Sequence, residues 1–352
     1  MSTMTPAPVE AAPETRRGRS ARSQLGALAE PYALVALLGV VVVFFSLWPE
    51  TSETYPTVAN IQAVVGNQSV LGIAALAALV PLAVGQFDLS VGAVLGLSSV
   101  FSASVMASGA PIPVAVLVGI GIGVAAGLVN GAIVTVLKVN SIIATLGTAT
   151  VIAGIVTLKT EGGSIIEGIP LSLTDFGSGN TFGVPRTALV LAGVALAAYY
   201  VLEHTPFGRY LLSVGTNARA AHLVGLKVDR LLLASFVIAG GLAGAAGVLQ
   251  VARGGGANPG VGESFTLPAL AAAFLSAAAI KPGRYNVGGT LVAIFFLAAL
   301  NSGLNLAGAE AYVSDWVNGV ALIAGIALAS ALGRGRAAWA RDEGPSEEER
   351  SQ

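Results

Sequence analysis

The sequence predicts an all-α polytopic transmembrane helix bundle of about ten spans, with the N- and C-termini in the cytoplasm. Hydrophobic residues make up 54% of the 352 residues and charged residues only 11%, whereas soluble domains carry roughly a quarter charged residues. The apolar runs are long enough for membrane helices of about 20 residues. They do not alternate with a period of two, which argues against a transmembrane barrel.

Ten apolar segments can be counted along the chain. Residues 1–30 are rich in Ala, Pro, Ser and Arg and are predicted to form a disordered, basic cytoplasmic tail. Residues 31–333 form the membrane domain, and residues 334–352 form a charged cytoplasmic tail. Tyr32–Trp48 precedes no small-residue cleavage site, so we expect it to remain as the first span. The segments are centred near residues 40, 77, 99, 125, 150, 194, 241, 273, 296 and 323.

The basic residues support this count. If the N-terminus is cytoplasmic and the segments alternate, 15 of the 18 Lys and Arg residues fall on the cytoplasmic side. Only Lys159, Arg186 and Arg253 fall outside. Random placement would not give this asymmetry, and removing any one segment would destroy it.

Small residues mark predicted helix contacts. Four glycines recur every four residues in the fourth segment, at Gly119, Gly123, Gly127 and Gly131. They share one helix face, where another helix can approach closely. Gly240 and Gly244 repeat the pattern in the seventh segment. We therefore expect these glycines to serve packing rather than contact with a solute.

The longest external loop runs from Lys159 to Arg186 and is rich in Gly, Pro and Ser. That composition suits turns and a short outer hairpin or helix. The loop is either a connector or a docking edge for an external partner, and its sequence favours neither.

Polar residues inside the apolar segments are the candidates for a translocation path. Asp88 in GQFDLSVG must face protein, a cavity or an aqueous boundary, because a carboxylate in lipid is costly. We favour a capping role for Asp88 at the third helix over a role in a pore or gate. Uncharged amides and hydroxyls suit a path for neutral polyols, although each alone is more typical of interhelical hydrogen bonding. The other candidates are Gln86, Ser90, Asn130, Asn140, Thr145, Asn301 and Asn305, of which the last two share one helical face.

No catalytic set is recognisable. The chain has no cysteine and only two histidines, so we expect no metal site and no cofactor bound by this chain. It lacks a GxxxxGK[ST] phosphate loop, a GxSxG elbow and an HExxH site, so any energy it uses comes from elsewhere. The net charge of −1 argues against a nucleic-acid partner. The absence of an acid–base chain in the membrane weakens an ion-coupled secondary transporter without excluding it.

Thr205–Arg230 is a polar, basic, helix-compatible segment between apolar runs. A structured basic segment that returns to the cytoplasm between spans suggests contact with a soluble partner. Contact with anionic membrane lipid is the alternative, which the length and order of the segment make the lesser one.

Four motifs resemble the ribose-type (simple-sugar) permeases of bacterial ABC importers, over about Asn60 to Leu332. They are GQFDLSVG, NGAIVTVLKVNSIIATLGT, TPFGRYLLSVGTNARAAHLVGLKVDR and NSGLNLAG. The resemblance implies a multi-pass permease subunit in the bacterial cytoplasmic membrane, with residues 31–333 as the permease domain. It also implies a second, identical or different permease subunit, two cytoplasmic ATPase subunits and an extracytoplasmic solute-binding protein. The chain itself would be no enzyme, and would form the path for a sugar or similar small polar solute.

The resemblance also assigns residues of the predicted cytoplasmic loop, residues 205–230, to ATPase coupling. The implied coupling residues are Phe207, Gly208, Arg209, Tyr210, Gly215, Asn217, Ala220, Ala221 and Gly225. The chain departs from the family at Arg219, where an acidic residue is usual, at 265–268 and 276–277, and in the turn at 281–290. These changes leave the identity of the solute open. A secondary transporter should show an inverted repeat, which is not evident, and a non-transporting scaffold or receptor should lack a polar path.

Overall fold

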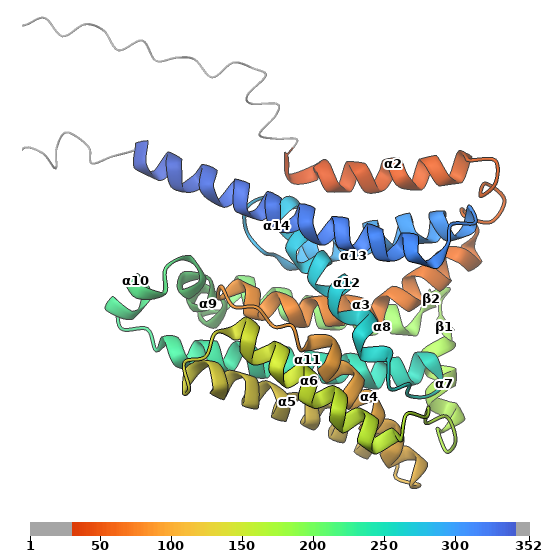
Figure 1. Cartoon of the computed structure of the whole chain (residues 1–352). Helices are drawn as coiled ribbons and strands as arrows, with labels where there is room; N and C mark the ends of the chain where they lie inside the picture. Colours follow the sequence, from red (N-terminus) through yellow and green to blue (C-terminus); the bar gives the residue numbers. More distant parts are fainter. Residues whose placement is uncertain (1–29, 343–352) are drawn as a thin grey trace, which may run out of the picture.

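The computed structural model describes residues 30–342, and helices dominate it (Figure 1). This confirms the predicted all-α bundle. The membrane helices are α2 (Ala33–Leu47), α3 (Val58–Ala83), α4 (Val91–Ala107), α5 (Ile112–Thr135), α6 (Ser141–Thr160), α8 (Arg186–Tyr199), α11 (Val228–Gly254), α12 (Val261–Leu275), α13 (Val287–Leu306) and α14 (Ala311–Asp342). The remaining elements are η1 (Glu30–Tyr32), α7 (Leu171–Ser178), β1 (Asn180–Thr181), β2 (Val184–Pro185), η2 (Tyr200–His204), α9 (Pro206–Thr216), α10 (Ala218–Leu223) and η3 (Ser276–Ala278).

Each predicted apolar segment coincides with one membrane helix. Within the described residues, eight helices are long and apolar enough to cross a membrane, and α2 and α4 are shorter apolar helices. The structure begins α3 at Val58, well before the apolar run around residue 77. Its polar first turns are helical because the Thr57 hydroxyl accepts a hydrogen bond from the backbone N–H of Asn60, at 3.2 Å.

Contacts between distant segments agree with the alternating topology. On the predicted cytoplasmic side, Lys138 pairs with Asp229. On the outer side, the side chain of Gln62 donates to the backbone of Gly183, and Ile165 forms a backbone bridge with Ala257. The outer loop contains both a short helix, α7, and a hairpin in which Asn180 pairs with Pro185.

The core is built around α3, α4, α11 and α12. Of the eight long helices, α3 is the most buried and α14 the least. In Figure 1, α3 crosses the centre of the bundle, with α2 and α14 along one edge and α5 and α6 along the other. Exposed apolar faces of the outer helices are therefore left for lipid or another subunit.

Glycines bring α5 and α11 into backbone contact. A methyl group added at Gly123 would collide with the carbonyl oxygen of Gly240, and one added at Gly240 would collide with that of Gly123. A methyl group on Gly244 would lie 2.7 Å from the carbonyl oxygen of Gly119. A methyl group on Gly127 would collide with the carbonyl oxygen of Phe236, and one on Gly131 would collide with the side chain of Leu233.

The predicted tails fall largely outside the described residues, which exclude 1–29 and 343–352. Helix α14 continues to Asp342, so the first part of the predicted C-terminal tail, residues 334–342, is helical.

We predict that Gly123→Ala lowers the thermal unfolding temperature of the purified protein. Its methyl group would force α5 and α11 apart, and overpacking of this kind costs about 1–3 kcal/mol. The control is Gly121→Ala on the same helix, because no atom lies within 4 Å of an added methyl group there. Equal unfolding temperatures for the two variants would contradict a packing role for this face.

Candidate functional site

The segment after α8 forms two short helices that project from the bundle on the predicted cytoplasmic side. Thr205 begins α9 by accepting a hydrogen bond from the N–H of Gly208 at 3.2 Å, and proline follows at the first helical position. Asn217 begins α10 by accepting from the N–H of Ala220 at 2.9 Å. Gly225 follows α10 with φ +86°, a left-handed conformation that ends a helix and favours glycine.

Helix α9 is fixed to the bundle. Leu211 and Val214 are buried. A methyl group on Gly215 would collide with the carbonyl oxygen of Ala83 at the end of α3. A methyl group on Gly208 would collide with that of Leu202. Helix α9 therefore packs at backbone distance against the end of α3 and against η2.

The predicted coupling residues divide by exposure. Gly208 and Ala221 are buried and Phe207 is half-buried, so these residues seat the segment on the bundle. The exposed ones are Arg209, Tyr210, Gly215, Asn217, Ala220 and Gly225.

Sequence reasoning missed the two most exposed apolar residues of the segment. Leu223 and Val224, at the tip of α10, are 82% and 78% exposed. An adjacent apolar pair in an otherwise polar, basic loop was the available signal. Their exposure gives α10 an apolar tip suited to contact with a partner protein.

A basic hollow of about 610 Å³ lies between α10 and the start of α11. Arg219, His222, Lys227 and Arg230 line it. Asp229 is the acidic residue in the lining. Both of its carboxylate oxygens lie 2.8 Å from Lys138 Nζ and form an ion pair with it. The hollow therefore keeps a positive charge that suits an acidic surface.

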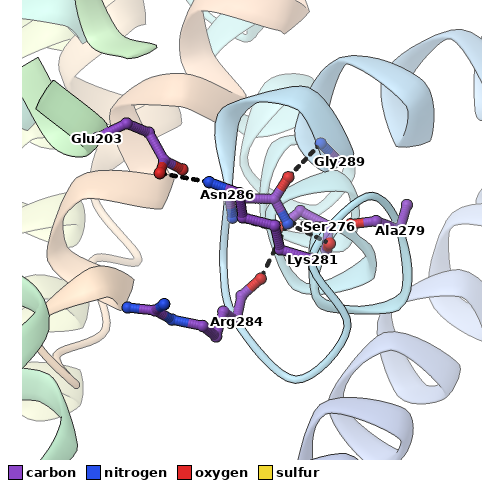
Figure 2. A network of polar contacts seen from close by, with 7 residues as sticks. All are labelled: Glu203, Ser276, Ala279, Lys281, Arg284, Asn286 and Gly289. Carbon is purple, nitrogen blue, oxygen red and sulfur yellow. Dashed lines mark hydrogen bonds and ion pairs between the residues drawn. The ribbon is translucent and has the colours of Figure 1, made fainter. Parts of the chain in front are cut away.

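A second turn on the predicted cytoplasmic side contacts η2, which precedes this segment (Figure 2). Asn286 organises the turn, because its amide nitrogen donates to the carbonyl oxygens of Ser276, Ala279 and Arg284 at 2.9–3.0 Å. Lys281 in the same turn forms an ion pair with Glu203, the residue before His204 at the end of η2. The sequence marked this turn only as a departure from the family pattern.

Tyr285 anchors this turn against α12. Its ring packs edge-to-face on Phe274, with centroids 5.9 Å apart. Burial raises the pKa of the Tyr285 hydroxyl above its ordinary value, because the phenolate form would lose its hydration.

Four of the predicted path residues meet in one buried cluster, where the turn that joins α3 to α4 packs on α5 and α6. Asp88 Oδ1 accepts from the N–H of Ser90 at 2.9 Å and from its hydroxyl at 2.6 Å. Asn130 Nδ2 donates to the Ser90 hydroxyl at 2.7 Å, and its Oδ1 accepts from the Thr148 hydroxyl at 2.6 Å. Thr145 accepts from the backbone N–H of Leu89 at 3.0 Å. The cluster fastens the turn before α4 to α5 and α6.

The capping interpretation of Asp88 is wrong in its detail. Ser90 is the N-cap residue of α4, and its side chain forms no hydrogen bond with the first turn of that helix. Asp88 instead closes a turn ahead of the helix by accepting from Ser90. The short Asp88 side chain accepts a hydrogen bond from the backbone N–H two residues further along the chain.

The other predicted path residues lie apart from this cluster or add no bond to it. Gln86 is half-buried beside it, and Asn140 is exposed and begins α6 by accepting from the N–H of Ile142. Asn305 is exposed on α13, whereas Asn301 is half-buried, with an Oδ1 that has no hydrogen bond within the described residues. The hydrogen bonds of the cluster run between its own members, so it joins the turn before α4 to α5 and α6.

We predict that Thr148→Val destabilises the protein by about 1–3 kcal/mol, because it leaves the buried Asn130 Oδ1 without its donor. The control is Thr157→Val on the same helix, where the hydroxyl is exposed and donates only to Ala153 of its own helix. Thermal unfolding of both purified variants checks this. Equal stability would show that the cluster does not fasten the turn.

Comparison with known proteins identifies the family. The family described as "Branched-chain amino acid transport system / permease component" matches residues 60–326. The ribose import permease protein of Escherichia coli (strain K12) is 32% identical over 299 residues, covering 84% of this chain and 92% of that protein. Its counterpart in Bacillus subtilis (strain 168) is 34% identical over 270 residues, or 76% and 84% of the two chains.

A further relative is the autoinducer 2 import system permease protein of Escherichia coli O9:H4 (strain HS). It is 31% identical over 258 residues, covering 72% of this chain and 78% of that protein. No solved structure gives a significant match. The apolar helices and these relatives make the chain a multi-pass membrane protein and a permease component rather than an enzyme. The chain belongs to the family of branched-chain amino acid transport system permease components.

Proposed function

We propose that this chain is one of two permease subunits of an ABC importer that carries a sugar or a similar small polar solute. A cytoplasmic ATPase supplies the energy, and an extracytoplasmic binding protein delivers the solute. The observation that carries the proposal is the segment Pro206–Leu223, in which a short helix with an apolar tip stands out from a bundle that holds it rigidly.

The relatives support a role in import and do not narrow the solute to one compound. Two of them are named for ribose import and one for autoinducer 2 import. A polar solute agrees with all three names. These names favour the ABC reading over the ion-coupled secondary transporter that the sequence left open.

Helix α10 is suited to transmit the motion of an ATPase to the membrane helices. Leu223 and Val224 supply an apolar contact, and the surrounding Arg219 and Lys227 supply positive charge. Because Gly215 contacts Ala83 at backbone distance, displacement of α9 displaces α3. Alternating access then follows from helix movements that ATP binding biases.

Co-purification with a candidate ABC ATPase from the same organism tests the proposal. We expect the wild-type complex to form and Leu223→Asp to abolish it, because a carboxylate would have to be buried at the contact. The control is Ile166→Asp, which changes a similarly exposed residue, 66% exposed, on the outer side. Equal recovery of the ATPase with both variants would contradict coupling through α10. A wild-type chain that binds no ATPase would reject the ABC assignment itself.

We predict that Gly225→Val uncouples ATP hydrolysis from uptake. A β-branched residue at φ +86° strains the end of α10 by roughly 1–3 kcal/mol, enough to reduce coupling roughly tenfold. The measurement is uptake of a panel of radiolabelled pentoses and hexoses per ATP hydrolysed in proteoliposomes. The control is Gly162→Val, which introduces the same strain at φ +78° in the outer loop with no atom near the new side chain. Equal coupling in both variants would show that the end of α10 plays no part.

A further inference from the structure

Helices α4 and α12 both begin inside the membrane. A methyl group on Gly262 would lie 2.6 Å from the carbonyl oxygen of Gly92, so the first turns of the two helices touch. The helices cross the bundle in opposite directions, because α4 ends beside the outer loop at Gly168 and α12 leads to the cytoplasmic turn at Lys281. Two antiparallel helices that spanned the whole membrane would place the start of one beside the end of the other. Contact between their starts therefore places both starts at mid-depth.

A cavity of about 300 Å³ opens at this contact, between α4, α6 and α12. Small residues leave the space, among them Ala93, Gly96 and Ala153. The polar side chains in the lining are Thr150, Glu263 and Thr266. The volume is at the lower end of the range for ligand pockets, roughly 300–1,000 Å³, and therefore suits a small solute.

Glu263 is the charged residue of this lining, in the first turn of α12. It is exposed, and it forms no ion pair or hydrogen bond with the described part of the chain. A carboxylate at mid-depth that faced lipid would be strongly disfavoured, so it faces water, a solute or another protein surface. In this it differs from the buried Asp88, whose Oδ1 accepts two hydrogen bonds from Ser90.

The cavity offers hydrogen-bond acceptors. The Thr150 hydroxyl donates to the carbonyl oxygen of Leu146 at 3.0 Å, and that of Thr266 donates to Gly262 at 3.4 Å. Their lone pairs and the Glu263 carboxylate remain available as acceptors. Such a lining suits a solute rich in hydroxyl donors and disfavours an anion.

We propose that this cavity is the membrane-interior site for the transported solute, a neutral polyhydroxylated molecule whose hydroxyl groups donate to Glu263. The inference rests on the proposed function and names the place and chemistry of the path.

Cysteine labelling tests the site, because the natural chain contains no cysteine. The variants are Glu263→Cys and the control Leu196→Cys, which lies within α8, outside the cavity lining, and is 68% exposed. Each is assembled with its ATPase in nanodiscs, where both faces are accessible, and treated with an anionic methanethiosulfonate. This reagent attacks the thiolate, which forms in water, so we expect Glu263→Cys to react roughly tenfold faster or more. Equal rates would overturn the proposal.

A functional arm tests passage of the solute. In proteoliposomes, modification of Ala153→Cys should stop ATP-driven sugar uptake, because Ala153 lines the cavity but offers the solute no side-chain hydrogen bond. The cysteine-free wild type should stay insensitive to the reagent, and unchanged uptake after full modification would overturn the proposal. If Glu263→Cys fails to assemble, Ala153→Cys replaces it in the labelling arm with the same expected result. A wild-type complex without ATP-driven uptake would count against the proposed function, and the labelling rates would still decide whether the cavity is aqueous.

Discussion

Backbone contact through glycine is the constraint on which the rest of the bundle depends. Inside a membrane, burial of apolar side chains gives little drive for helix association, so close van der Waals packing must supply it. Helix α11 approaches α5 through Gly240 and Gly244, and a methyl group on Gly247 would collide with the carbonyl oxygen of Leu95 in α4. These contacts fix α11 at the centre. Its first residue, Val228, follows the exposed turn after α10, so the same packing also holds the segment that we assign to the ATPase.

The sequence predicted the helices because they depend on a local property, namely the length of the apolar runs. It did not predict which polar residues meet. Asp88, Asn130 and Thr148 belong to different elements, and only the packing of α4, α5 and α6 brings them together. For the same reason, Asn286 was missed. It looks like an ordinary turn residue, and its role depends on carbonyl groups up to ten residues away.

Hydrogen bonding divides the polar residues of the membrane domain into two groups. The cluster around Ser90 is buried, and its members bond to one another. Glu263 and Thr150 border a cavity, and their oxygens remain available as hydrogen-bond acceptors. A transported solute must exchange bonds with the path, so side chains already bonded to one another are a poor place for it. The sequence pointed to Asp88 as a path candidate, although it favoured a capping role there, and it did not point to Glu263.

Helix α12 links the proposed solute site to the proposed ATPase contact. Its first turn carries Glu263, and the turn beyond its last residues carries Lys281, which pairs with Glu203 at the root of α9. Both partners of this pair are partly shielded from solvent, so it is screened less than the open pair of Lys138 and Asp229. Force on α10 thus has two routes into the bundle, one through Gly215 to α3 and one through Glu203 to α12. Because the second route ends at the cavity, a single helix, with Pro268 in its interior, is sufficient to connect an ATP-driven movement to the proposed solute site.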